Sequence, residues 1–144
     1  MRYFHSVRIR VFSSQDNAKE ALAWLTGLDF EKEKIVVEEK VATGLNEQPI
    51  HILSLHLEKQ RRVRTCTELL HKRIKEKATL LQQLSSRLDD NLDFFLRFEK
   101  TDVFAKKLKL TDTGDCFHLK LSVAAFPKSK KRALELLTEF WNKT

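Results

Sequence analysis

Apolar and polar residues alternate strictly near the start of the chain, and this pattern narrows the possible folds most. Between residues 3 and 12, Val7 and Ile9 point to one side while Arg8 and Arg10 point to the other. Successive side chains of a strand project from opposite faces of a sheet, so a period of two indicates a strand buried on one face only. The chain must therefore supply a layer that covers the apolar face, and it leaves a basic face outside.

Later segments repeat this pattern and alternate with helical ones. Further strands are predicted at 34–43, 49–58, 92–100, 106–111 and 116–126, with a turn at 44–47 and a short connection at 101–105. Helices are predicted from a cap at Ser13 or Ser14 to near Gly27, over 59–88 with a break near 75–79, and after a cap at Ser129. This order favours an α+β fold, a two-layer sandwich in which helices pack on one face of a mostly antiparallel sheet.

Length and net charge bound the class of protein. A chain of 144 residues is expected to form one domain, 1–144, that buries a core without needing disulfide bonds or metal ions. Lys and Arg number 27 against 20 Asp and Glu, which favours an acidic partner, nucleic acid before an anionic membrane. No apolar run reaches membrane-spanning length and no signal peptide is visible, so a cytoplasmic protein with reduced Cys66 and Cys116 is expected.

Positive charge is sorted along the chain. Residues 59–77 hold eight Lys and Arg against two Glu, whereas residues 13–47 hold four Lys against eight acids. A one-sided basic field attracts polyanions, so the helix predicted over this basic stretch is a candidate RNA contact through Arg61, Arg62 and Arg64. A solvated helix face is the alternative interpretation of this stretch.

Cations also gather on the outward side of the predicted strands. Candidate contacts there are Arg8, Arg10, Arg97, Lys100, Lys109 and Lys120, and Lys128, Lys130 and Lys131 join them at the start of the last helix. Strand spacing and residue rise are both a few ångströms, so such side chains can follow a phosphate backbone, and a helix N-terminus suits a phosphate. Ordinary solvated charge that protects edge strands from aggregation is the alternative.

A Phe-rich strand at 94–98 suggests a platform for stacking bases. Phe94, Leu96 and Phe98 share one face of that strand, and burial preferences favour a core role for them. Phe95 alone of the three Phe residues shares the side of Arg97.

Catalytic motifs are missing from the sequence. Its histidines form no metal-binding pattern, and three glycines are too few for a phosphate-binding loop. Asp89, Asp90 and Asp93 form the one acid cluster, for which a solvated helix end is favoured over a metal site. The chain is therefore expected to be a non-enzyme without cofactor or metal. A protein–protein adaptor that docks on acidic partners, and a nuclease that uses these acids, are the alternatives.

Four stretches of the chain resemble a known family. Residues 4–12 (FHSVRIRVF), 49–53 (PIHIL), 96–100 (LRFEK) and 120–127 (KLSVAAFP) are similar to archaeal RNA-binding proteins described as predicted exosome subunits. The resemblance implies a compact fold like that of some ribosomal proteins, RNA as the partner, and a role near RNA processing, with exosome or ribosomal components as possible partners. It also implies RNA contacts at Arg97 and Lys100, which with Glu99 match a basic and acidic run of the family, although the loop at 101–105 departs from that family's small, Gly-containing form.

Overall fold

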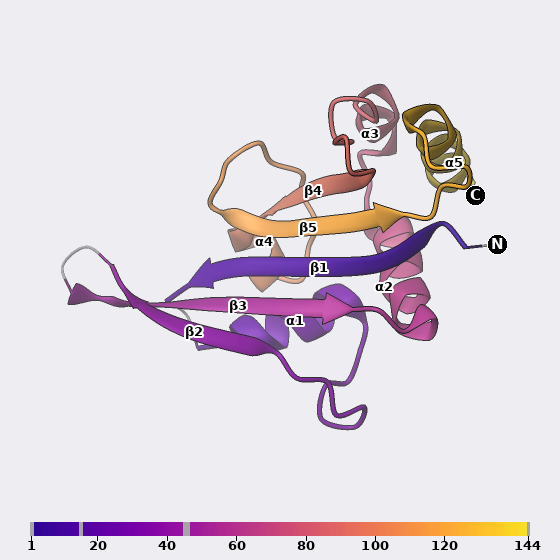
Figure 1. Cartoon of the computed structure of the whole chain (residues 1–144). Helices are drawn as coiled ribbons and strands as arrows, with labels where there is room; N and C mark the ends of the chain where they lie inside the picture. The colour runs from indigo at the N-terminus through magenta and orange to yellow at the C-terminus, as the bar shows by residue number, and fades with distance from the viewer. Residues whose placement is uncertain (1, 15, 45–46, 144) are drawn as a thin grey trace.

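The computed structural model describes residues 2–14, 16–44 and 47–143, which form an antiparallel sheet with helices against one face (Figure 1). The elements in chain order are β1 (Phe4–Ser13), α1 (Ala18–Thr26), β2 (Glu38–Thr43), β3 (Pro49–Leu57), α2 (Gln60–Arg73), α3 (Lys77–Gln82), β4 (Asp93–Glu99), α4 (Lys100–Phe104), β5 (Cys116–Val123) and α5 (Lys130–Asn142). The predicted α+β fold class is confirmed.

The first strand lies at the centre of the sheet, whose order is β2-β3-β1-β5-β4. It pairs antiparallel with β3 on one side and with β5 on the other, so that Arg8 stands opposite both His56 and Lys120. Paired residues project from the same face. Segments that are far apart in the sequence are therefore brought together on one side of the sheet.

The other side of the sheet is the core. Val7, Ile9 and Val11 are fully buried there, as are the matching residues of the neighbouring strands. Figure 1 shows α1, α2 and α4 behind the sheet, while α3 and α5 lie at the end where β4 begins. The last helix contributes Phe140 and Trp141 to this core, and its cap is the predicted one, since the Ser129 hydroxyl accepts a hydrogen bond from the backbone N–H of Arg132. Within the described residues, no helix has the length and apolarity to cross a membrane.

The predicted strand at 106–111 is wrong. Only Leu110 forms a bridge, with Phe98 of β4. The backbone N–H of Lys107 instead donates to the carbonyl of Asp102 at 2.8 Å. This bond joins the first half of the segment to α4 and not to the sheet. Most of the predicted connection at 101–105 belongs to this short helix, α4, which places the side chain of Val103 in the core.

Several predicted boundaries also move. The cap predicted at Ser13 or Ser14 is wrong, because β1 continues to Ser13 by pairing with His51, and Asn17 precedes the helix instead. β2 starts only at Glu38, and a hydrogen-bonded turn occupies residues 29–35 of the segment before it. The predicted turn at 44–47 lies partly outside the described residues. The long helix breaks at 74–76, slightly earlier than predicted, and its second part ends at Gln82.

Alternation in β1 can be tested by unfolding in urea. Ile9→Ala should lower the free energy of unfolding by about 2–5 kcal/mol, because it leaves a cavity in the core. Arg8→Ala, one residue away on the exposed face, should change that free energy by no more than about 0.5 kcal/mol. Equal effects of the two substitutions would contradict the assignment of faces.

Candidate nucleic-acid interface

The open face of the sheet, meaning the face that carries Arg8 and Arg10, arranges polar and aromatic side chains in two rows across the strands. The register of the four strand pairs places the first row as Glu38, Ser54, Arg10, His118 and Arg97, and the second row as His56, Arg8, Lys120 and Phe95. Both rows combine residues from at least three strands. The predicted contacts at Arg8, Arg10, Arg97 and Lys120 are therefore brought together.

The cations of this face differ in how far they are neutralised. Arg8 and Arg10 are exposed, and neither has an ion-pair partner in the described part of the chain. Lys120 lies 3.3 Å from a carboxylate oxygen of Asp93, and Arg97 donates to the backbone carbonyl of Asp112 at 3.2 Å. At the centre of the open face, Arg8 and Arg10 are therefore the two cations that no carboxylate of the described residues pairs with.

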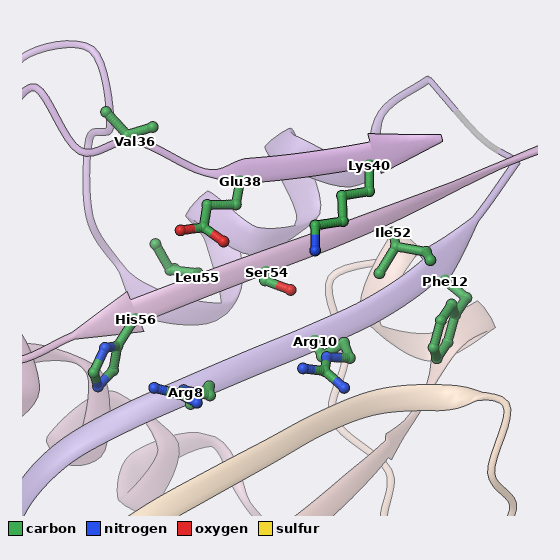
Figure 2. Close-up of a pocket in the computed structure, with 10 residues that line it drawn as sticks. All are labelled: Arg8, Arg10, Phe12, Val36, Glu38, Lys40, Ile52, Ser54, Leu55 and His56. Atoms are coloured by element: carbon green, nitrogen blue, oxygen red, sulfur yellow. The ribbon is translucent and has the colours of Figure 1, made fainter. Parts of the chain in front are cut away.

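A hollow of about 520 Å³ lies over the β2, β3 and β1 side of this face. Figure 2 shows Arg8, Arg10 and Phe12 of β1 beside His56 of β3, with Lys40 of β2 facing them. Phe12 is 44% exposed, which is unusual for a large apolar side chain in a strand. The hollow thus joins cations to an accessible aromatic ring.

A second hollow of about 410 Å³ lies over β4 and β5. Phe95, Arg97 and His118 line it, together with Arg87 from the segment that follows α3. His118 is adjacent to Arg10 in the first row, so the strip of β1 and β5 connects the two hollows.

The surroundings of His118 favour the neutral form of its imidazole. Partial burial lowers its pKa, and the positive charges of Arg97, Arg10 and Lys120 lower it further, in that order. The lowered pKa therefore favours a ring that adds no charge of its own beside the three cations.

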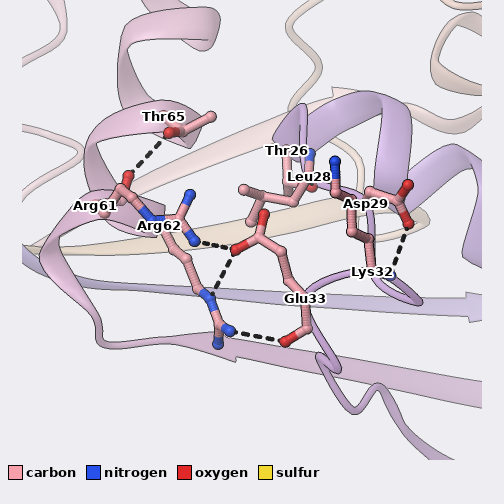
Figure 3. A network of polar contacts seen from close by, with 8 residues as sticks. All are labelled: Thr26, Leu28, Asp29, Lys32, Glu33, Arg61, Arg62 and Thr65. Atoms are coloured by element: carbon pink, nitrogen blue, oxygen red, sulfur yellow. Dashed lines mark hydrogen bonds and ion pairs between the residues drawn. The ribbon is translucent and has the colours of Figure 1, made fainter.

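The arginines predicted on the basic helix lie elsewhere. Helix α2 is in the helical layer, and Figure 3 shows Arg61 and Arg62 around Glu33 of the loop before β2. The Arg62 Nε lies 3.3 Å from the Glu33 carboxylate, and its Nη2 donates to the Glu33 carbonyl at 3.0 Å. These two guanidinium groups fix a loop, whereas Arg64 is exposed beside the start of β1.

The remaining predicted contacts are spread around the sheet. The ammonium of Lys100 bonds to the carbonyl of Phe12 and lies 2.6 Å from Asp115, and little of its side chain is exposed. Lys109 is exposed, and its carbonyl accepts a hydrogen bond from the Glu99 amide at the outer edge of β4.

At the start of α5, Lys130 forms an ion pair of 3.0 Å with Asp90. Lys128 and Lys131 are exposed there. None of these three lysines belongs to the two rows of the open face.

The carboxylates of the acid cluster, Asp89, Asp90 and Asp93, form hydrogen bonds or ion pairs within the chain. One carboxylate oxygen of Asp89 accepts from the backbone N–H groups of Asn91 and Asp93, each at 2.9 Å. Asp90 and Asp93 pair with lysines, as described above. Among the described residues, no three potential metal ligands gather into one group.

Sequence reasoning missed three members of the site. His56 and Arg87 carry no local signal, and the alternation of the strand predicted at 116–126 places His118 on the outward face without marking it as a contact. Only the register of β5 against β1 and β4 reveals that His118 lies between Arg10 and Arg97.

A family model described as RNA binding matches residues 6–123. An RNA-binding protein from Pyrococcus abyssi is 24% identical over 142 residues, which cover 94% of this chain and 92% of that protein.

Solved structures are similar over nearly the whole chain. A DUF54 protein from Methanothermobacter thermautotrophicus has a TM-score of 0.79 at 23% identity and covers 98% of this chain and 100% of its own. A DUF54 protein from Sulfolobus solfataricus has a TM-score of 0.69 at 18% identity and covers 95% and 97%. At such identities these likenesses show a shared fold.

Removal of the Glu33 carboxylate should loosen the loop that it anchors. Hydrogen bonds from Arg61 and Arg62 lower the pKa of Glu33 below its usual 4.5. The ionised carboxylate therefore stabilises the folded state above pH 4.5, and this stabilisation is lost as the pH falls through the lower pKa of the folded state. Glu33→Gln should therefore reduce the free energy of unfolding at pH 7, and the deficit should shrink in acid. Glu31→Gln, an exposed neighbour, is the control. A loss of unfolding free energy that does not change with pH would contradict an ionic interaction between Glu33 and the two arginines.

NMR titration of the His118 ring should give a pKa below 6.5. Arg97→Gln should raise that pKa, because it removes one of the cations that oppose protonation. Between the folded and unfolded pKa values the unfolded chain binds the extra proton, so the free energy of unfolding should fall as pH decreases through this window. A pKa at or above 6.5 that is the same in the Arg97→Gln variant would show that the cations do not lower the pKa of the ring.

Proposed function

The chain belongs to the RNA-binding family, and from this premise we propose that it binds RNA without catalysis, through the open face of its sheet. Arg8, Arg10, Arg97 and Lys120 are the central contacts of the proposal. Its main support is the pair of cross-strand rows, which gather cations from β1, β4 and β5 on an uncovered surface.

The geometry of a sheet suits this task. Neighbouring strands lie about 4.8 Å apart and alternate residues about 6.8 Å apart, so the rows form a lattice of positive charges that successive phosphates can contact. Arg8 and Arg10 are the strongest candidates, since they are exposed and without an ion pair in the described residues. Their guanidinium groups are also able to donate two hydrogen bonds to one phosphate.

Peripheral cations have smaller roles in the proposal. Lys109, Lys128 and Lys131 are exposed and can add outer phosphate contacts. Arg61, Arg62, Lys100 and Lys130 are engaged with carboxylates of the same chain, so each would have to give up an existing partner.

Binding without catalysis fits the state of the acid cluster, whose carboxylates accept backbone hydrogen bonds or pair with lysines. We further propose a cytoplasmic role in RNA processing, as the family resemblance implies, with the exosome as one partner. Co-purification after nuclease treatment tests that partnership, and RNA that stays intact during incubation with Mg²⁺ supports the absence of catalysis.

Fluorescence anisotropy with RNA over a range of salt concentrations tests the interface. Four central contacts predict a slope of log K against log salt of about −3 to −4. Arg10→Glu should weaken binding several-fold and reduce the slope by about 1. Arg64→Glu makes the same charge change in the helical layer and should have a much smaller effect.

Equal weakening by the two variants would contradict an interface on the open face and would indicate binding by overall charge. No binding of the unmodified protein at low salt would contradict the RNA-binding proposal itself and would favour an adaptor that docks on acidic proteins.

A further inference from the structure

The hollow over β4 and β5 combines the volume of a ligand cleft with a lining of aromatic and cationic side chains. Its volume of about 410 Å³ falls within the range of about 300–1,000 Å³ that is typical of ligand clefts. Its floor is formed by Phe95, Arg97 and His118. Its walls are two segments that bond to the outer edge of β4, since the backbone N–H of Phe95 donates to the carbonyl of Arg87 at 2.9 Å and that of Thr111 donates to the carbonyl of Arg97 at 3.0 Å.

Two aromatic rings lie together on this floor. The ring centroids of Phe95 and His118 are 5.4 Å apart and the planes are inclined by 38°. Phe95 is only partly buried, whereas Phe94 and Phe98 of the same strand are fully buried in the core. The strand therefore turns one phenyl ring toward the open face, where a planar group is able to stack on it.

The guanidinium groups of the hollow are fixed in place. The Nε and Nη2 of Arg87 donate to the side-chain oxygen of Gln83 at 3.0 and 2.8 Å, and its Nη1 donates to the carbonyl of Phe95 at 3.3 Å. Arg97 is held by its bond to the carbonyl of Asp112. Planar guanidinium groups stack on bases, and their N–H groups donate to base edges and phosphates.

The hollow opens onto the cationic rows. Arg10 and Arg97 flank His118 in one row, and Lys120 stands opposite Phe95 in the other. Phosphates on either side of a bound nucleoside would meet these cations, while its base occupied the hollow.

We propose that this hollow binds one unpaired nucleobase of single-stranded RNA, which stacks on Phe95 and His118 between Arg87 and Arg97. The proposal rests on RNA binding by the open face and adds the class of RNA to it. A continuous duplex keeps its bases inside the helix and cannot place one here, so the site selects single strands, loops or bulges.

Anisotropy with a 12-nucleotide single strand and with a duplex of the same sequence tests this pocket. Phe95→Ala should weaken binding of the single strand about 5- to 150-fold, the effect of removing one stacking partner. It should leave duplex binding within about twofold. Phe95→Leu keeps most of the apolar volume without the ring and should lose affinity as well, which keeps the test valid if the Ala variant unfolds.

Phe12→Ala is the matched control, because Phe12 is an exposed ring on the same face but in the other hollow. It should reduce single-strand binding far less than Phe95→Ala. Photocrosslinking with a 5-iodouridine single strand, read out by mass spectrometry, should label Phe95 or His118.

The outcomes separate the two proposals. Unchanged single-strand affinity in both Phe95 variants, together with the loss caused by Arg10→Glu, would overturn the base pocket and leave the RNA-binding face in place. A complete lack of RNA binding by the unmodified protein would overturn both. Equal losses for single strand and duplex would also overturn the pocket.

Discussion

Burial of alternate residues of β1 against the helices is the constraint on which the core and the candidate interface both depend. Burying one large aliphatic side chain contributes about 1.5–3 kcal/mol, and Val7, Ile9 and Val11 are all fully buried. A slip of one residue would expose these three and push Arg8 and Arg10 into the core without partners. Hydrophobic burial, rather than ion pairing, therefore keeps the two arginines on the open face.

Local patterns predicted the faces of the strands but not their neighbours. The alternation in β1, β4 and β5 sufficed to place Phe94 inside and Arg97 outside, because a period of two is a property of one segment. The row through Arg10, His118 and Arg97 needs strand order and register, which no single segment carries. The prediction of short elements failed for a related reason. Burial of Val103 in the core stabilises α4, and the helix propensity of five residues does not reveal such a tertiary contact.

The sorted charge of the chain has a partly internal explanation. The acidic segment supplies Glu33, and the basic helix α2 supplies Arg61 and Arg62, which hold it (Figure 3). Part of the opposite charge in these segments thus pairs within the fold. Arg8 and Arg10 of β1, whose own charge run is short, have no ion-pair partner among the described residues. A count of charges along the sequence cannot tell these two cases apart, because it does not show what each side chain faces.

We propose that hydrophobic burial fixes the orientation of β1, that strand register assembles cations and aromatic rings on the open face, and that an RNA strand contacts them. Amide NMR spectra recorded during titration with a single-stranded RNA test the central claim most directly, because they report every part of the surface at once. RNA contact at the open face predicts that signals from β1 near Arg10, β5 near His118 and β4 near Phe95 shift together, while those of α2 stay in place. Shifts confined to α2 and the start of α5, with the sheet unchanged, would contradict it.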